Sequence, residues 1–141
     1  MKKTIRSMAW IISVLLLLFC LISCNTVEKA GIWEDATYRK DMEFGEGDKT
    51  VVVEVEAEKQ IVTFTIRTDA ETVGEALLEH ELIDGEQGAF GLYVKVVNGI
   101  TADFDVDQSY WSFQIDGEYA MAGVDGTEIV EGSIYRLIYT K

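Results

Sequence analysis

Residues 50–82, TVVVEVEAEKQIVTFTIRTDAETVGEALLEHEL, decide the fold. Apolar and polar side chains alternate over residues 50–58 and again over residues 61–67, which is the period of a half-buried strand. Only Lys59 and Gln60 separate the two runs, so together the runs predict a β-hairpin. The side chains expected to point inward are Val53, Val55, Ala57, Val62, Phe64 and Ile66.

The end of this stretch, residues 72–82, predicts a helix. Thr72 and Glu75 have the spacing of a capping box, in which each side chain accepts a hydrogen bond from the backbone amide of the other. Gly85 is expected to terminate the helix, and His80 to be a solvated residue near its C-terminal end. The apolar stripe expected to be buried consists of Val73, Ala76, Leu77, Leu78 and Leu82.

Further strands are predicted after the helix, separated by glycine-containing turns such as the one at Asp116 and Gly117. The order is therefore a hairpin, a helix and then several strands. Because a single amphipathic helix must cover one face of the sheet, this order predicts an α+β fold, a β-grasp-like mixed sheet with one covering helix. The expected later strands are residues 92–97, 111–115, 118–122 and 134–139.

The first 23 residues have the plan of an export signal. Basic side chains near the start precede an uncharged apolar run over residues 9–22, which is shorter than the roughly 20 residues of a spanning helix. We therefore expect a cleaved leader, with a permanent N-terminal anchor helix as the alternative. Leu21-Ile22-Ser23-Cys24 resembles the bacterial lipobox, which implies that Cys24 carries lipid and that the leader is cut before it. Two or three acyl chains would hold the protein at the extracytoplasmic face of the cell membrane.

The expected organisation has three segments. Residues 1–23 form the lipoprotein signal peptide, residues 24–48 a lipidated tether and N-terminal segment, and residues 49–141 the domain. Within the second segment, residues 31–44 mix aromatic and charged side chains without a clean period. They are interpreted either as a short edge strand or as a segment wrapped on the domain.

The composition excludes several classes of protein. The chain has 25 acidic and 12 basic residues and a formal net charge of −13, which opposes contact with nucleic-acid phosphates and electrostatic binding to anionic lipid headgroups. It has one histidine and two cysteines, one of them inside the leader. A disulfide scaffold and a multi-histidine metal centre are therefore excluded, and no cofactor is expected.

Several spaced motifs resemble the transcobalamin C-terminal-like domain family of bacterial surface lipoproteins. The resemblance spans roughly residues 51–139 and implies a β-grasp fold and a role in cobalamin, or corrinoid, capture. In the animal vitamin B12 carriers this domain closes over cobalamin held by a large helical domain. This chain has no room for that partner, so the resemblance implies a contributory role. The matching motifs are TVGEAL at 72–77, VNGI at 97–100, YWSF at 110–113, GV at 123–124 and GSIY at 132–135.

The aromatic hairpin around Asp116 is the candidate ligand site. Aromatic rings can cover the apolar face of a flat ligand such as a corrin, and Asp116 can accept hydrogen bonds from its amide rim. Trp111 and Phe113 share a face with Ile115 and are interpreted as core residues, whereas Tyr110 and Tyr119 are the better candidates for surface residues. The candidate ligand-binding residues are Tyr110, Trp111, Asp116, Tyr119 and Met121.

Two other kinds of site are weaker. Asp103, Asp105 and Asp107 have the spacing that opens a calcium loop, but Gln108 stands where that loop needs glycine, so solvated carboxylates are expected. For nucleophilic catalysis, the sequence offers three serines after the leader but only one histidine base, His80. No enzyme is therefore predicted. The alternative to a ligand-binding module is a surface protein-interaction or adhesion module that docks a partner through a sheet edge or hairpin.

Overall fold

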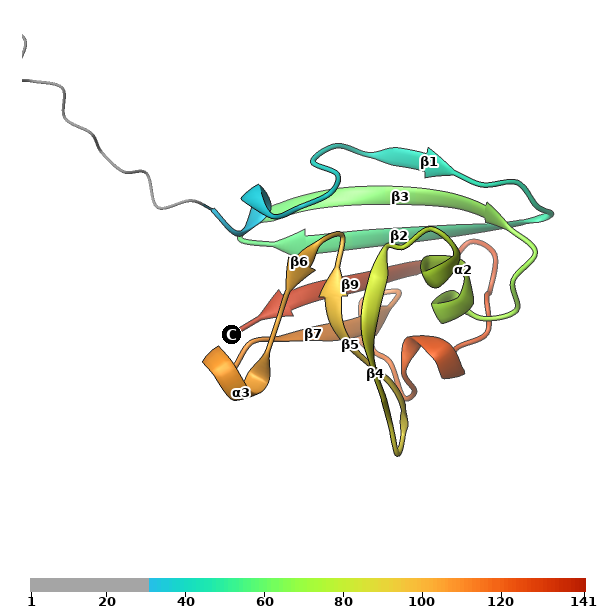
Figure 1. Cartoon of the computed structure of the whole chain (residues 1–141). Helices are drawn as coiled ribbons and strands as arrows, with labels where there is room; N and C mark the ends of the chain where they lie inside the picture. Colours follow the sequence, from blue (N-terminus) through green and yellow to red (C-terminus); the bar gives the residue numbers. More distant parts are fainter. Residues whose placement is uncertain (1–30) are drawn as a thin grey trace, which may run out of the picture.

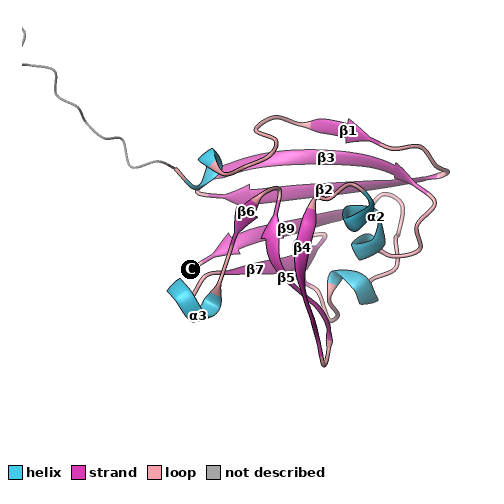
Figure 2. Cartoon of the chain, in the orientation of Figure 1, coloured by secondary structure: helices cyan, strands magenta, loops and turns pink. Residues whose placement is uncertain are grey.

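Two sheets and one main helix make up the part of the chain described by the computed structural model, residues 31–141 (Figures 1 and 2). The predicted leader and Cys24 lie outside the described residues. In spatial order, the main sheet contains β1 (Met42–Phe44), β3 (Gln60–Thr68), β2 (Lys49–Ala57), β9 (Ile134–Thr140), β7 (Tyr110–Ile115) and β8 (Glu118–Tyr119). The second sheet contains β4 (Ile83–Gly88), β5 (Gly91–Val97) and β6 (Ile100–Thr101). The helical elements are η1 (Ile32–Glu34), α2 (Val73–Glu79), α3 (Phe104–Asp107) and η2 (Val124–Gly126).

The predicted hairpin is β2 and β3, and its alternating pattern matches the burial of the six side chains expected to point inward. The turn contains Glu58 and Lys59, one residue earlier than expected, and both have positive φ angles, 47° and 70°. Two such residues make the turn whose twist fits a two-residue hairpin.

The main sheet is mixed because its two central strands, β2 and β9, run parallel with Val53 opposite Tyr135. Its other long pairs, β2 with β3 and β7 with β9, are antiparallel. The prediction of a mixed α+β fold with one main helix is therefore confirmed.

Helix α2 begins as predicted and ends early. Both hydrogen bonds of the capping box between Thr72 and Glu75 are present, at 3.2 Å each. The chain leaves the helix at His80, and Glu81 follows with a φ of 53°. The amide of Leu82 then donates to the carbonyl of Leu77 at 2.9 Å, which closes the C-terminal turn.

Two details of the helix prediction are wrong. Leu78 is exposed, because it lies one residue beyond the buried Leu77 and each residue turns the helix by about 100°. Gly85 does not end the helix but lies in β4 beside an irregularity in the pairing with β5. A Cβ atom at Gly85 would come within 2.0 Å of the carbonyl oxygen of Tyr93, so this strand needs glycine there.

The second sheet was not predicted as a separate layer. Its first strand, IDGEQG, has neither alternation nor β-branched residues beyond Ile83, so it carries no strand signal. With α2, this sheet lies over one face of the main sheet (Figure 1). The covering layer is therefore a helix together with a small sheet, and not the helix alone.

The segment before residue 49 belongs to the folded body. Trp33 is buried, and its Nε1 donates to the carbonyl oxygen of Ala57 at 2.9 Å. Strand β1 pairs in parallel with β3 at the sheet edge. The folded body therefore begins well before the expected boundary at residue 49. Within residues 31–141, no helix is long and apolar enough to cross a membrane.

Candidate functional site

Strand β7 divides the predicted ligand residues between the two faces of the main sheet. Trp111 points to the covered face, where it is buried and meets the ring of Tyr139 edge-on at 5.5 Å. Phe113 points the same way and stacks on Tyr135, with ring centroids 6.2 Å apart. These two aromatic side chains pack against the core.

The two tyrosines of the candidate site lie on the open face but at opposite ends of the sheet. Tyr110 pairs with Thr140 at one end of β7, and Tyr119 on β8 pairs with Gln114 near the other end. The structure therefore does not bring Tyr110 together with Tyr119. Met121 follows β8 and is fully exposed.

A shallow hollow of about 330 Å³ opens beside the turn between β7 and β8. Its lining residues are Asp116, Gly117, Ile134 and Arg136. Asp116 anchors the turn, because its Oδ1 accepts from the amide of Ile134 at 2.8 Å while its own amide donates to the carbonyl of Ile134 at 2.9 Å. Asp116 is thus positioned at the rim of a concave surface, with one carboxylate oxygen already in use.

Arg136 lines this hollow and lies on the open face of β9. Its Nε donates to Glu54 Oε2 at 2.7 Å, its Nη2 contacts the same oxygen, and Nη1 lies 3.9 Å from Glu56. Gln114 stands between Arg136 and Tyr119 in the register of the sheet. The hollow therefore combines an ion-paired guanidinium on β9 with an exposed aromatic ring on β8, and β7 lies between them.

A second surface, missed from the sequence, lies where β5 contacts β7 between the two sheets. These two strands carry four half-buried side chains that pack against the core, Leu92 and Val94 on β5 and Phe113 and Ile115 on β7. We call these four residues the apolar seam. The alternation in residues 92–97 signals the strand, but nothing in the sequence indicates that β5 faces β7.

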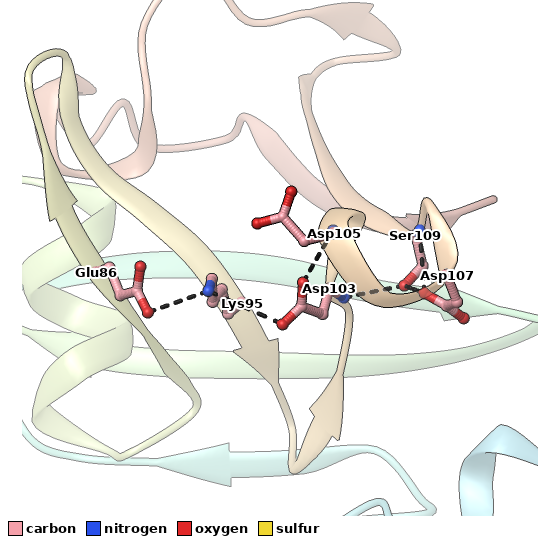
Figure 3. Close-up of polar contacts among 6 residues, drawn as sticks. All are labelled: Glu86, Lys95, Asp103, Asp105, Asp107 and Ser109. Atoms are coloured by element: carbon pink, nitrogen blue, oxygen red, sulfur yellow. Dashed lines mark hydrogen bonds and ion pairs between the residues drawn. The ribbon is translucent and has the colours of Figure 1, made fainter.

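The acidic loop after β6 uses its carboxylates internally (Figure 3). Asp103 caps α3 by accepting from the amide of Asp105 at 3.0 Å. Asp107 accepts from Lys141 Nζ at 2.6 Å and from the hydroxyl and amide of Ser109. The hydrogen bond from Lys141, followed by that from Ser109, lowers the pKa of Asp107 to about 2.

Lys95 provides a second cation beside this loop. Its Nζ lies 3.0 Å from Glu86 and 4.0 Å from Asp103, and the hydrogen bond to Glu86 raises its pKa (Figure 3). In the described part of the chain, no group of three or more histidine, cysteine, aspartate or glutamate side chains is placed to hold a metal ion. The carboxylates of this loop are arranged as helix cap and ion pairs.

His80 contacts a different part of the domain. It is half-buried at the C-terminal end of α2, where its ring stacks on Phe44 at 5.4 Å. Ser109 is instead hydrogen-bonded to Asp107 and to the amide of Asp103. The histidine expected to be solvated is thus partly covered by an aromatic ring.

Comparison with solved structures relates the chain to "a putative metal binding protein" from Ruminococcus gnavus ATCC 29149. The two are 32% identical, with a TM-score of 0.63, over 67% of this chain and 98% of that one. The chain and this Ruminococcus protein belong to one family. Residues 70–134 also match the family described as "Domain of unknown function (DUF4430)". That span leaves out β2 and β3 and reaches only the first residue of β9.

A second similar structure is haptocorrin in complex with Cbi. It is 18% identical to this chain, with a TM-score of 0.51 over 70% of this chain. The match covers only 26% of haptocorrin, so the chain spans about a quarter of that protein's length. At this identity the likeness shows a shared fold, of the transcobalamin C-terminal type. No curated protein sequence matches the chain.

Proposed function

We propose that this protein is a lipid-anchored, cell-surface binding module that contributes to the capture of a corrinoid and catalyses no reaction. One observation carries the proposal: the domain has the fold of a part of haptocorrin, a protein whose structure holds Cbi. The lipobox at Cys24 supports the anchored location. The β-grasp arrangement is part of the same proposal, supported by the parallel central pair beside the helix.

The geometry suggests which residues would contact such a ligand. A corrin has a broad apolar face and a rim of amides. Tyr119 and Met121 offer exposed apolar surface after β7, on the same open face of the sheet as the hollow. Asp116 lies at the rim of the hollow, where it can accept from an amide. Because these groups cover one side of a ligand only, we expect affinity on the order of micromolar.

The metal in the name of the Ruminococcus protein is not carried over to this chain. Asp103 and Asp107 already accept internal hydrogen bonds and pair with Lys95 and Lys141. A cation would have to displace both lysines to reach these carboxylates. The acidic loop therefore supports a structural role for these residues.

Titration calorimetry of the purified protein with cobalamin and with Cbi tests the proposal. Binding of either is expected, and Tyr119→Ala should weaken it more than tenfold, about 1.4 kcal/mol or more. Tyr93→Ala is the matched control, because Tyr93 is also an exposed strand tyrosine but lies on the second sheet. Absence of heat with both ligands, together with an unchanged melting temperature, would refute corrinoid binding and favour the protein-interaction alternative.

The anchor is tested separately by Cys24→Ala. This variant should accumulate as an uncut precursor and lose metabolic labelling with fatty acid, whereas the natural chain is labelled. Equal labelling of the two proteins would rule out Cys24 as the lipid attachment site.

A further inference from the structure

One end of the domain gathers its N-terminal entry, its C-terminus and a group of exposed apolar side chains. Trp33 in η1 is bonded to Ala57 at the last residue of β2, which places the entry of the chain at this end. Strand β9 runs parallel to β2, so Thr140 and Lys141 lie at the same end (Figure 1). Tyr110 pairs with Thr140 and joins them. We call this the anchor end.

Helix α3 belongs to the anchor end because Asp107 is paired with Lys141 at 2.6 Å. Its two apolar side chains point to solvent, with Phe104 55% and Val106 81% exposed. Ile61, at the start of β3, and Tyr110 are exposed at the same end. Nothing in the described part of the chain covers these apolar groups.

The length of the tether decides which end of the domain lies next to the membrane. Six residues separate Cys24 from Gly31, the first described residue, so the two Cα atoms are at most about 25 Å apart. A folded body of this size has a radius of gyration of about 13 Å and is therefore wider than the tether is long. A lipid on Cys24 thus keeps the anchor end close to the membrane.

Acidic side chains are present at both ends of the sheet. At the opposite end, Lys49 and Arg67 stand among the carboxylates Glu46, Asp48, Asp69, Glu71, Glu128 and Glu131. At the anchor end, Lys59 and Lys141 stand beside Glu58 and Asp107, and Asp103 and Asp105 flank Phe104. The orientation therefore rests on the length of the tether and on the exposed apolar side chains, and not on charge.

We propose that the anchor end rests on the lipid surface, with Phe104 and Val106 of α3 inserted at the boundary between headgroups and acyl chains. This inference rests on the lipid anchor of the proposed function. The apolar face of an amphipathic helix that lies on a membrane enters that boundary by about 5–10 Å. The hollow at Asp116 lies at the opposite end of β7 and therefore faces away from the membrane.

Site-specific fluorescence tests this orientation in the acylated protein. Val106→Cys and Val130→Cys are labelled with an environment-sensitive dye, and each protein is reconstituted into vesicles of phosphatidylcholine and phosphatidylglycerol. Both side chains are exposed valines, 81% and 58%, and Val130 lies in the loop that leads into β9 at the opposite end. Lipids carrying a quencher near the headgroup boundary should remove most of the emission at position 106 and little at position 130.

Two outcomes would overturn the inference, and they are distinguishable. Protein that floats with the vesicles but shows equal quenching at both positions would refute the orientation while leaving the anchor intact. Protein that does not float would refute the anchor and the orientation together. A second labelled variant, Ile61→Cys, should follow position 106, and its failure to do so would confine the contact to α3.

Discussion

The side chain of Asn98 pairs with the backbone of Tyr38 as a neighbouring strand would. Its Oδ1 accepts from the Tyr38 amide at 2.8 Å, and its Nδ2 donates to the Tyr38 carbonyl at 2.7 Å. Asn98 is fully buried, and its carbonyl also accepts from the amide of Thr37 at 2.8 Å. The side chain of Asn98 therefore holds the N-terminal segment, which leads to the proposed anchor, against the second sheet through two hydrogen bonds.

Removing this side chain should weaken the attachment of the N-terminal segment to the second sheet. Asn98 has a φ of 51°, which glycine adopts freely, so Asn98→Gly isolates the loss of the two hydrogen bonds. We expect it to lower the free energy of unfolding by about 1–3 kcal/mol, measured by urea denaturation. Asn98→Ala should cost more, because alanine is also strained at this φ. A glycine variant as stable as the natural protein would contradict this role.

The capping box of α2 makes a second prediction. Thr72→Ala removes the acceptor for the Glu75 amide at the helix start and should destabilise the domain by about 1 kcal/mol in chemical denaturation. Thr72→Ser keeps a hydroxyl and is the matched control. Equal stability of the alanine and serine variants would show that the cap contributes nothing.

Gly74 is expected to behave unlike an ordinary helix glycine. Alanine favours helices, yet a Cβ atom at Gly74 would lie 2.8 Å from the backbone of Asp125, so Gly74→Ala should cost about 1–3 kcal/mol. Gly126→Ala is the control, because its Cβ would meet only the Ala122 side chain at 3.5 Å. Thermal unfolding of the two variants should separate them, and a stabilised Gly74→Ala protein would contradict the packing argument.

The two aromatic residues Trp111 and Tyr119 should separate stability from binding. Trp111→Ala empties a buried position and should cost about 3–5 kcal/mol of unfolding free energy. Tyr119 is exposed, so Tyr119→Ala should leave the urea midpoint nearly unchanged. A large loss of stability in the Tyr119 variant would mean that its ring supports the fold and would remove it from the candidate site.

Acid should weaken the link between α3 and the C-terminus. The pKa of Asp107 is lowered to about 2, so its ion pair with Lys141 adds stability above the ordinary pKa of 3.8, and this contribution is lost as the pH falls towards 2. Asp107→Asn should therefore reduce the dependence of the unfolding free energy on pH between about 4 and 2. Above that range, the curves of unfolding free energy against pH for the variant and the natural protein should run parallel. An unchanged slope between pH 4 and pH 2 would refute the prediction.

Local patterns in the sequence predicted those elements whose signal is local. The alternation around Val53 and Phe64 and the spacing of Thr72 and Glu75 are set by neighbours in the chain, and the structure has them. Strand β4 was missed because its glycine-rich sequence becomes a strand only by pairing with β5. The division of Tyr110 and Tyr119 between two ends of the sheet depends on register, and the apolar seam depends on the contact of two sheets. A single sequence carries neither kind of long-range information.

The parallel pairing of β2 with β9 has a consequence for how the chain is made. Strand β9 follows the other described strands in the chain yet enters the centre of the sheet, where Glu54 opposite Arg136 joins residues 82 positions apart. Contacts so distant along the chain slow folding, and none of them can form before β9 is available. A ribosome-bound chain from which β9 has not yet emerged would therefore lack a central strand of its main sheet. We therefore expect the main sheet to remain without one of its two central strands until β9 is present. Removal of residues 134–141 should yield a protease-sensitive chain that does not fold.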